Sequence, residues 1–434
     1  MSKRNRIIIC MTLCILVLLC VVYFNINNDK TIRIGVFTGS PWGVPDAYTY
    51  EFIDDAIEKF EKEHPGVTVE YISGIMKEDY SEWLSGQVVA GKAPDVFMVL
   101  PDDFSVLTDT GAIMCLDSII SKDKTFDSER FYEGSYKYGN VNGKQYALPL
   151  ESAPEMMFVN KSLLAKETIL VPETDWTWDD FYNICEKVTK DLDGNGVIDQ
   201  FGVYNYSWEQ AFLTNGVHIF DDSGKNCTIQ GENAQQAVDF LKKINALNKG
   251  TVVTSSDFDM GRVAFMPVTL AEYRTYKPYP WSIKKYSNFN WECITLPRGP
   301  QGENVSTMNT LILAMNSRTK KKEIAWELMK TFCYDSDIQL EVYKYRGGGS
   351  VLKEVLNQNQ ALLNENQALP KNSSLNIRII HSIMEAGVPA YNFSNFDDSR
   401  KLISNGITEI IDNNENPPIA LKNLQREVNQ SLTK

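Results

Sequence analysis

Histidine is scarce in this sequence. Only His64, His218 and His381 occur among 434 residues. The chain also lacks the Gly-x-Ser-x-Gly, His-Glu-x-x-His, Walker A and Gly-x-Gly-x-x-Gly motifs, which carry nucleophilic, zinc-dependent, nucleotide and dinucleotide chemistry. We therefore expect no enzyme, although abundant carboxylates leave a secreted glycoside-acting enzyme open as an alternative.

Cysteine is too scattered for a disulfide framework or a zinc site. Three of the eight cysteines lie before residue 21, and no Cys-x-x-Cys pair occurs among the other five. That number is odd, which also argues against complete pairing. We expect these five to be small buried hydrophobes: Cys115, Cys185, Cys227, Cys293 and Cys333.

Positive charge is under-represented. The chain has 43 Lys and Arg against 56 Asp and Glu, a formal net charge of −13. Because Lys3, Arg4 and Arg6 precede the first acidic residue, the rest of the chain is still more acidic. Such a body is repelled by phosphate backbones, so nucleic acid is excluded as a partner.

Uncharged runs are short except at the N-terminus, where Ile7 to Phe24 carries no charge. A helix of this length spans roughly 27 Å, close to a bilayer core. The preceding basic residues predict a cytoplasmic N-terminus with the remainder outside. Residues 1–28 are therefore predicted to be an uncleaved transmembrane anchor or a processed signal helix, with the body at the extracytoplasmic face of the cell membrane.

The segment that follows alternates strand and helix patterns. Thr31 to Phe37, Val67 to Ile72 and the apolar run Pro94 to Val99 favour strands, with helical spacing between them. This β-α-β-α-β order predicts an open α/β sheet. Thr177 and Asp180 form a predicted capping box. Further helices are predicted over Ala234 to Leu247, Glu323 to Phe332 and Ala420 to Leu432.

Several motifs in order resemble the sugar-binding solute receptors of ABC importers, the family that includes the maltose-binding protein. They include Phe52 to Tyr71 (FIDDAIEKFEKEHPGVTVEY), Gly143 to Lys161 (GKQYALPLESAPEMMFVNK), Thr177 to Phe181 (TWDDF), Leu296 to Gly302 (LPRGPQG) and Lys320 to Phe332 (KKKEIAWELMKTF). Each motif is weak alone. Their order spans nearly the whole chain after residue 30.

This resemblance implies a two-lobe periplasmic-binding-protein-like α/β fold with hinge crossovers. We expect residues 31–148 and 270–318 in the N-lobe, and 149–269 and 319–434 in the C-lobe. The implied function is capture of a solute, an oligosaccharide by family likeness, in the cleft between the lobes, for ABC permease subunits. A monomer is expected. A membrane-anchored sensor that presents its closed form to a sensor kinase is an alternative.

The resemblance also suggests ligand-binding residues, because sugars need aromatic planes together with carboxylate, amide and Arg partners. Trp42 follows the first strand, and Asp102 or Asp103 follows the third. The alternatives are a packed loop aromatic for Trp42 and a helix N-cap for Asp102. The other candidates are Tyr206, Trp208, Glu209, Glu272, Tyr273, Trp281, Asn309 and Arg346. Trp208 could equally belong to the core.

Three departures from the family pattern suggest a ligand unlike the common maltooligosaccharides. Thr269-Leu270-Ala271 stands where Gly-x-Trp is usual, so that Tyr273 or Trp281 would have to replace the aromatic platform. Met308-Asn309 stands where Gly-Gly is common. Ser350 stands where a Pro often follows the glycine turn.

An acidic loop carries a candidate structural Ca²⁺ site. Asp191, Asp193, Asn195, Val197 and Asp199 occupy the first, third, fifth, seventh and ninth places of an EF-hand-like loop, with Gly196 at the sixth. The twelfth place is Gly202 rather than a bidentate Glu. We therefore expect Ca²⁺ binding weaker than that of an EF-hand, with an Asx-rich turn without metal as the alternative.

Overall fold

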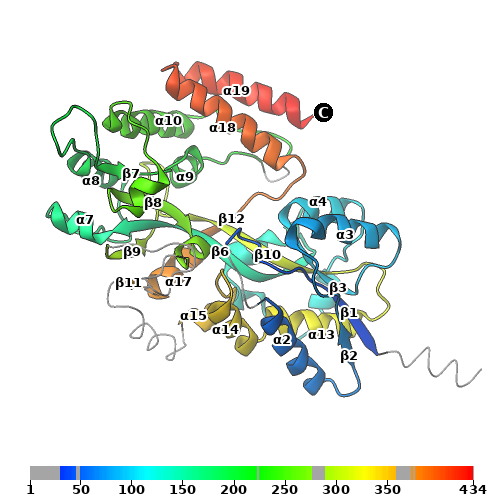
Figure 1. Cartoon of the computed structure of the whole chain (residues 1–434). Helices are drawn as coiled ribbons and strands as arrows, with labels where there is room; N and C mark the ends of the chain where they lie inside the picture. Colours follow the sequence, from blue (N-terminus) through cyan, green and yellow to red (C-terminus); the bar gives the residue numbers. More distant parts are fainter. Residues whose placement is uncertain are drawn as a thin grey trace, which may run out of the picture.

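Two long strands run through the middle of the protein and join its two halves (Figure 1). These are β6 (Ala147–Asn160) and β10 (Ser306–Met315). The structure is a computed structural model that describes residues 30–44, 49–221, 224–275, 289–357, 373–374 and 377–433. The first half of β6 pairs antiparallel with β10, and its second half pairs with β8 (Val263–Thr269) and β9 (Trp291–Ile294). The strand therefore passes from one sheet into the other between Pro154 and Glu155.

The first lobe is built on the sheet order β6-β10-β3-β1-β2. Its remaining strands are β1 (Thr31–Gly35), β2 (Thr68–Glu70) and β3 (Val96–Val99). All four residues of β3 are buried, as its apolar run predicts for a strand covered on both faces. The helices of this lobe are α2 (Thr49–Glu63), α3 (Lys77–Val89), α4 (Pro101–Asp109), α13 (Lys322–Cys333) and α14 (Ser336–Tyr345).

The second lobe adds β7 (Phe201–Val203) beside β8 and β11 (Ser373–Ser374) beside β9, so that the described strands around the end of β6 have the order β11-β9-β6-β8-β7. α18 and α19 pack on each other and on α10 at its outer face (Figure 1). The helices are α7 (Lys161–Lys166), α8 (Trp178–Val188), α9 (Trp208–Thr214), α10 (Glu232–Asn245), η2 (Ala246–Asn248), α11 (Ser255–Asp259), α12 (Leu270–Tyr273), α18 (Phe396–Asp412) and α19 (Pro417–Leu432).

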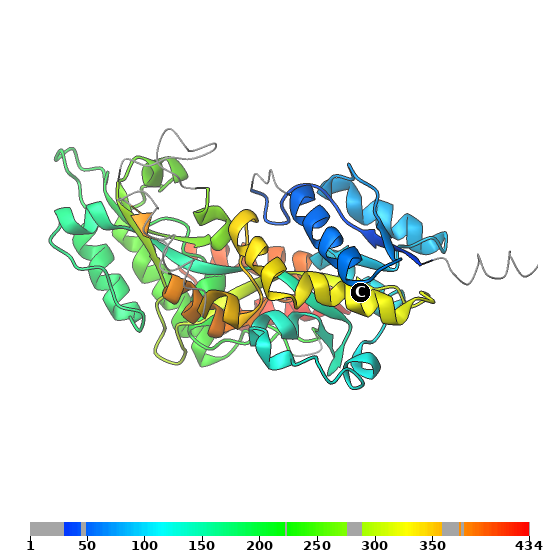
Figure 2. The ribbon, with the colours of Figure 1, turned by 90° about the horizontal axis from the view of Figure 1, so that it is seen from below.

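A third group of short elements packs beneath the two crossing strands, as the view from below shows (Figure 2). Their core includes Phe131, Tyr132, Phe158, Met308 and Ile380. The elements are α5 (Asp117–Ile120), η1 (Ser128–Arg130), α6 (Glu133–Tyr138), β4 (Asn140–Val141), β5 (Lys144–Gln145), α15 (Lys353–Asn357), β11 (Ser373–Ser374), α17 (Ile377–Glu385) and β12 (Gly387–Pro389).

Local sequence signals predict many of these elements. The capping box of Thr177 and Asp180 is present at the start of α8, and the spacing of Ala234, Ala237, Val238 and Leu241 gives the buried stripe of α10. Cys185, Cys227, Cys293 and Cys333 are buried and Cys115 is half-buried, and all five are free thiols. The predicted two-lobe α/β fold is confirmed.

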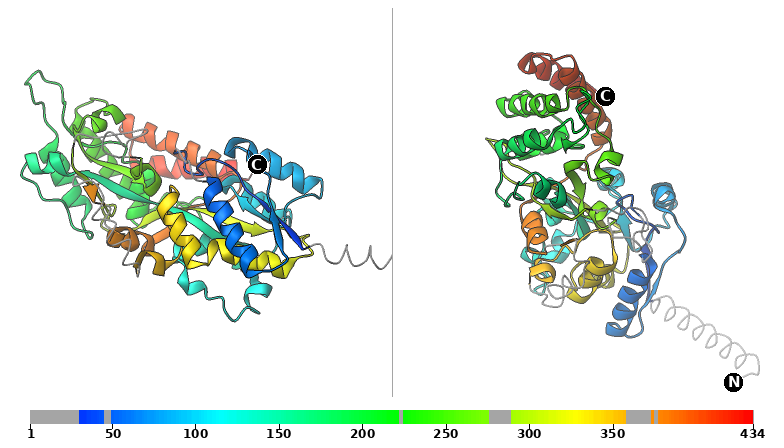
Figure 3. Two further views of the ribbon diagram at one scale, coloured as in Figure 1. Left: turned by 60° about the horizontal axis from the view of Figure 1, so that its bottom comes forward. Right: turned by 60° about the vertical axis from the view of Figure 1, so that its left-hand side comes forward.

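The lobe boundaries are more interleaved than the sequence predicts. α13 and α14 pack against α2 in the core of the first lobe (Figure 3), where Trp326 is buried. The predicted assignment of residues 319–434 to the second lobe therefore does not describe these helices. Conversely, α12 and β9 pack on the second-lobe part of β6, although residues 270–318 were assigned to the first lobe.

The predicted anchor, residues 1–28, lies outside the described residues. Among the helices that the structure does describe, none combines the length and apolar character needed to cross a membrane.

Candidate ligand-binding site between the lobes

One face of β6 carries polar side chains at the point where the strand leaves the first lobe. Glu151, Ala153 and Glu155 occupy alternate positions, so their side chains share a face. Asn309 of β10 pairs directly with Ala153, and Thr269 of β8 pairs with Glu155. Directly paired residues of antiparallel strands also share a face. At the junction between the lobes this face exposes one carboxylate (Glu155), one amide (Asn309) and one hydroxyl (Thr269), while Glu151 lies buried beneath it.

The first-lobe loop after β1 reaches this surface through Trp42. Its indole Nε1 donates a hydrogen bond to Glu151 Oε1 at 2.7 Å. Trp42 packs against a small apolar cluster formed by Val44, Ala153 and Ala271. Since Ala271 belongs to α12 of the second lobe, Trp42 contacts both lobes, and it remains partly exposed.

Glu151 is the centre of a buried polar group. Its Oε2 accepts a bond from Arg346 Nε at 2.6 Å, and its Oε1 also accepts one from the Gly348 backbone N–H at 2.6 Å. Both charged side chains are inaccessible to solvent, with exposed fractions of 0% for Glu151 and 1% for Arg346. Arg346, predicted as a ligand contact, is therefore an internal ion-pair partner in this structure.

The glycine turn that follows Arg346 is shaped by this carboxylate. A Cβ atom on Gly348 would lie 2.7 Å from Glu151 Cγ and 2.9 Å from the Ser152 carbonyl oxygen. Gly349 exchanges two backbone hydrogen bonds with Ser152. Only a residue without a side chain fits at position 348, so the turn sequence and the buried Glu151 depend on each other.

A second group of carboxylates lies at the second-lobe end of the polar face. Glu155 accepts a bond from Gln210 Nε2 at 3.1 Å. Glu209, one residue earlier on α9, binds Arg400 of α18 through both carboxylate oxygens, from Nε at 2.5 Å and Nη2 at 2.9 Å. Burial, followed by repulsion from Glu209 and Glu272, raises the pKa of Glu155 to about 7, against smaller opposing effects of Gln210 and Arg400.

Glu155 should make stability fall as the pH rises. Its folded-state pKa of about 7 lies above the unfolded value of 4.5. The proton is therefore held more tightly in the folded state, and the stabilisation is lost between pH 4.5 and somewhat above pH 7. We expect Glu155→Gln to be more stable than wild type at pH 8, by up to about 3 kcal/mol, and to lose this advantage near pH 4.

Urea unfolding at a series of pH values measures this difference. Glu133→Gln is the control, because Glu133 is exposed and Lys137 lowers its pKa. Equal pH profiles for wild type and Glu155→Gln would contradict the expected coupling.

On the first-lobe side, Asp102 and Asp103 lie in the first turn of α4. Leu100 occupies the N-cap and Pro101 follows it, so Asp102 is not the helix cap. Asp103 accepts a bond from Ser81 Oγ at 2.7 Å, whereas Asp102 is exposed. Desolvation, followed by the nearby Asp397, raises the pKa of Asp102, and Lys77 and Lys401 oppose this. Because Asp102 is exposed and Asp103 is bound to Ser81, Asp102 is the more available of the two aspartates.

Three predicted aromatic contacts are largely buried in this structure. Tyr206 accepts a bond from Trp178 Nε1 at 3.0 Å within the second core. Trp208 packs edge-on against Phe212, and Tyr273 packs edge-on against Phe158. Trp281 lies outside the described residues. Glu272 is exposed and caps α12 with Thr269.

Sequence reasoning missed Glu151, Glu155, Gln210 and Arg400. A usable signal existed for the first two, because they are the two charged residues inside the otherwise apolar and small stretch Ala147–Asn160. A carboxylate in such a strand needs a partner. No local pattern marks Gln210 or Arg400, whose partners lie 55 and 191 residues away.

The acidic loop before β7 brings its carboxylates together. Oxygens of Asp191, Asp193 and Asp199 all lie within 4.8 Å of one another. Asp191 accepts backbone N–H bonds from Gly194, Asn195 and Gly196, which lower its pKa. Gly202, at the twelfth place, packs against Cys185 and adds no ligand. The residues present fit a hard cation with oxygen ligands, but the set is smaller than that of an EF-hand.

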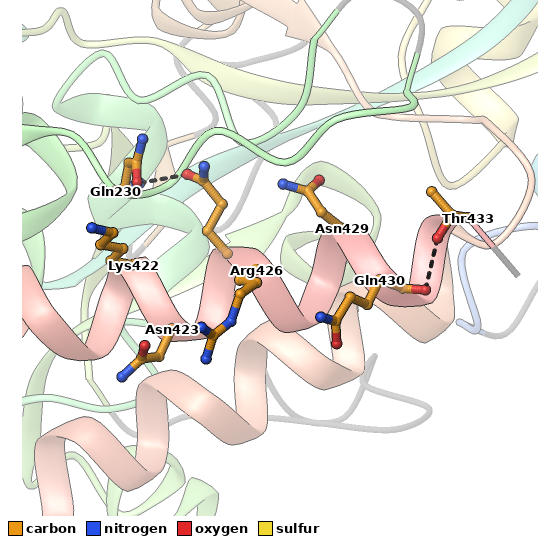
Figure 4. Close-up of a pocket in the computed structure, with 8 residues that line it drawn as sticks. Gln230, Lys422, Asn423, Arg426, Asn429, Gln430 and Thr433 are labelled. Carbon is orange, nitrogen blue, oxygen red and sulfur yellow. Dashed lines mark hydrogen bonds between the residues drawn. The ribbon is translucent and has the colours of Figure 1, made fainter.

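A surface pocket of about 430 Å³ lies on α19, on the outer side of the second lobe (Figure 4). Its amides already bind the backbone: Gln425 accepts from the Gln230 N–H at 2.9 Å, and Asn429 from the Cys227 N–H at 2.7 Å. None of the predicted ligand-binding residues lines it. The pocket lies where α19 is hydrogen-bonded to the loop before α10.

Two α/β lobes joined by crossing strands, with polar and aromatic side chains gathered where they meet, define a solute-binding protein of the two-lobe class. The chain belongs to the bacterial extracellular solute-binding protein family, whose sequence model matches residues 55–371. This confirms the resemblance predicted from the sequence.

Known proteins of similar sequence and structure agree with this class. The chain is 23% identical over 299 residues to an uncharacterised lipoprotein encoded upstream of oleD in Streptomyces antibioticus, covering 63% of this chain and 61% of that protein. The chain thus spans about three-fifths of this relative's length.

Two solved structures share the fold. The cyclic alpha-maltosyl-1,6-maltose binding protein of Arthrobacter globiformis has a TM-score of 0.76 at 14% identity, covering 93% of this chain and 98% of that one. An ABC substrate-binding protein of Listeria monocytogenes in complex with cycloalternan has a TM-score of 0.65 at 18% identity, covering 93% and 99%.

Proposed function

We propose that this protein captures an oligosaccharide between its lobes, outside the cytoplasm, and delivers it to an ABC permease without altering it. The observation that carries the proposal is the polar face of β6 and β10, with Glu155 and Asn309, beside the partly exposed Trp42. Aromatic planes with carboxylates and amides are what sugar rings and hydroxyls require.

The structural neighbours support saccharide as the solute class. The Listeria protein is in complex with cycloalternan, and the Arthrobacter protein is a cyclic alpha-maltosyl-1,6-maltose binding protein. The departures from the family pattern at positions 269–271, 308–309 and 350 favour a ligand unlike the common maltooligosaccharides. Residues 1–28 would hold the monomer at the membrane, as an anchor or before signal processing; the lipoprotein relative is consistent with attachment. Presentation to a sensor kinase remains the alternative destination.

Thermal unfolding of the full chain with cycloalternan, cyclic alpha-maltosyl-1,6-maltose and maltotetraose tests the proposal. A ligand at about 100 times its dissociation constant adds roughly 2.7 kcal/mol, which should raise the midpoint clearly. Absence of any rise with these saccharides would contradict saccharide binding. Appearance of new reducing ends with turnover would instead indicate a glycoside-acting enzyme. Growth on the bound sugar, compared with and without the permease, separates import from sensing.

We also propose that the loop of Asp191, Asp193, Asn195, Val197 and Asp199 binds a structural Ca²⁺. The converging carboxylates support it, since three like charges within 4.8 Å favour a cation between them. Val197 would add its backbone carbonyl. When bound, the ion would neutralise this loop and brace the turn that leads into β7.

Calcium should raise the thermal midpoint, and a chelator should reverse the rise. Asp193→Asn should abolish this response, because it removes one ligand charge while the bonds that Asp191 receives from the backbone stay intact. Asp175→Asn, an exposed aspartate before α8, is the matched control. An identical response in wild type and Asp193→Asn would contradict the assignment.

A further inference from the structure

We infer that Glu151 is a positioning residue for the ligand site, whose buried carboxylate fixes the orientation of the Trp42 indole. The inference rests on the proposed function and deepens it. Glu151 is fully buried, so a solute cannot reach it. Its effect on binding must therefore pass through the groups that it holds.

Three donors from two distant parts of the chain meet at this carboxylate. They are the Trp42 indole N–H, 109 residues before Glu151, the Arg346 guanidinium, 195 residues after it, and the Gly348 backbone N–H. Charge-assisted hydrogen bonds are short and strong, and burial strengthens them further. The carboxylate thus joins the loop after β1 to the glycine turn after α14.

Trp42 is held on two sides by this arrangement. Its Nε1 is bound to Glu151, and Trp42 packs against Ala153 and Ala271 and lies close to Gly347. A tryptophan has only two side-chain torsions, and a directional bond combined with packing restricts both. A contact surface that is fixed before the ligand arrives loses less conformational entropy on binding.

The same group reaches the second lobe. Arg274, directly after α12, donates from Nη1 to the backbone oxygens of Tyr343 at 2.7 Å and Arg346 at 2.6 Å. Arg346 in turn holds Glu151 through its side chain. The carboxylate therefore fixes Trp42 of the first lobe relative to α12 of the second, the two elements that contact each other beside Ala153.

A double-mutant cycle tests this positioning role. Trp42→Phe keeps an aromatic ring but removes the N–H donor, and Glu151→Gln keeps the side-chain shape but removes the charge. Each single variant should bind the saccharide identified above at least about tenfold more weakly. The double variant should bind no more weakly than the poorer single variant, because one change removes and the other weakens the same hydrogen bond.

Fluorine NMR of protein labelled with 5-fluorotryptophan gives a readout that does not depend on the ligand. The protein has eight tryptophans. The resonance of Trp42 is identified as the one that is missing from the spectrum of Trp42→Phe. Glu151→Gln should shift or broaden it, while the resonance of Trp326, whose indole binds Asp123 at 2.8 Å, should stay in place.

The outcomes separate the two proposals. If no saccharide binds wild type, the proposed function fails, and the NMR spectrum still decides whether Glu151 fixes Trp42. If wild type binds but Trp42→Phe binds equally well, the ring alone suffices and the positioning role is overturned. An unchanged Trp42 resonance in Glu151→Gln, or fully additive losses in the double variant, would overturn it too.

Discussion

Replacing Glu151 by alanine should destabilise the protein by about 3–5 kcal/mol, because the change leaves the Arg346 guanidinium buried without its counter-charge. The pair is inaccessible to solvent, and the carboxylate also accepts from Trp42 and Gly348. Urea unfolding followed by circular dichroism measures the loss.

The control is an ion pair of the same chemistry at the surface. Glu133 and Lys137 are 71% and 61% exposed, so Glu133→Ala should change stability by no more than about 0.5 kcal/mol. Similar losses in the two variants would mean that burial does not set the energetics of the Glu151 pair.

Replacing Trp42 by alanine should weaken saccharide binding by at least about tenfold, equivalent to roughly 1.4 kcal/mol. The folded state should also lose the indole–Glu151 hydrogen bond, about 1 kcal/mol, together with the packing of the partly buried ring on Val44, Ala153 and Ala271. Calorimetric titration measures the affinity, and urea unfolding measures the stability.

Trp208→Ala provides the opposite case. Trp208 is only 7% exposed and packs on Phe212 in the second core, so its removal should cost about 3–5 kcal/mol of stability. Its effect on affinity, measured well below the unfolding midpoint, should be smaller than that of Trp42→Ala. A larger affinity loss for Trp208→Ala than for Trp42→Ala would indicate that the aromatic ligand contact is on α9 and not in the first lobe.

Patterns confined to a short stretch of sequence correctly predicted the local structure. The apolar run of β3 predicts a strand buried on both faces, and the Thr177 capping box predicts the start of α8. These features depend on residues a few positions apart, whose geometry is fixed by the backbone itself. The family resemblance then ordered the elements into two lobes.

The lobe to which a helix belongs was harder to predict from the sequence. The amphipathic pattern of α13 shows that one face is buried but not which sheet buries it. In the structure its partners are α2 and the first-lobe sheet, reached after the chain has crossed back along β10. The sheet against which the helix packs depends on how distant segments are connected, and helical periodicity carries no information about this.

The candidate site shows the same division. The sequence predicts Trp42 and Asp102 as ligand contacts, because loops that follow parallel strands gather at one edge of a sheet. Tyr206, Trp208 and Tyr273 carry equally suitable side chains, yet they pack into cores. An aromatic residue has the same identity in a core and in a binding site, so only its surroundings assign its role.

The sequence by itself determined the α/β class, the apolar strands, the helix caps and the family, because these rest on neighbouring residues or on motifs in order. Only the tertiary structure decided that Glu151 holds Trp42, Arg346 and Gly348, and that Glu155 lies beside Glu209 and Arg400. The physical reason is that a buried charge is defined by partners up to 195 residues away, and those partners meet only when the lobes are assembled.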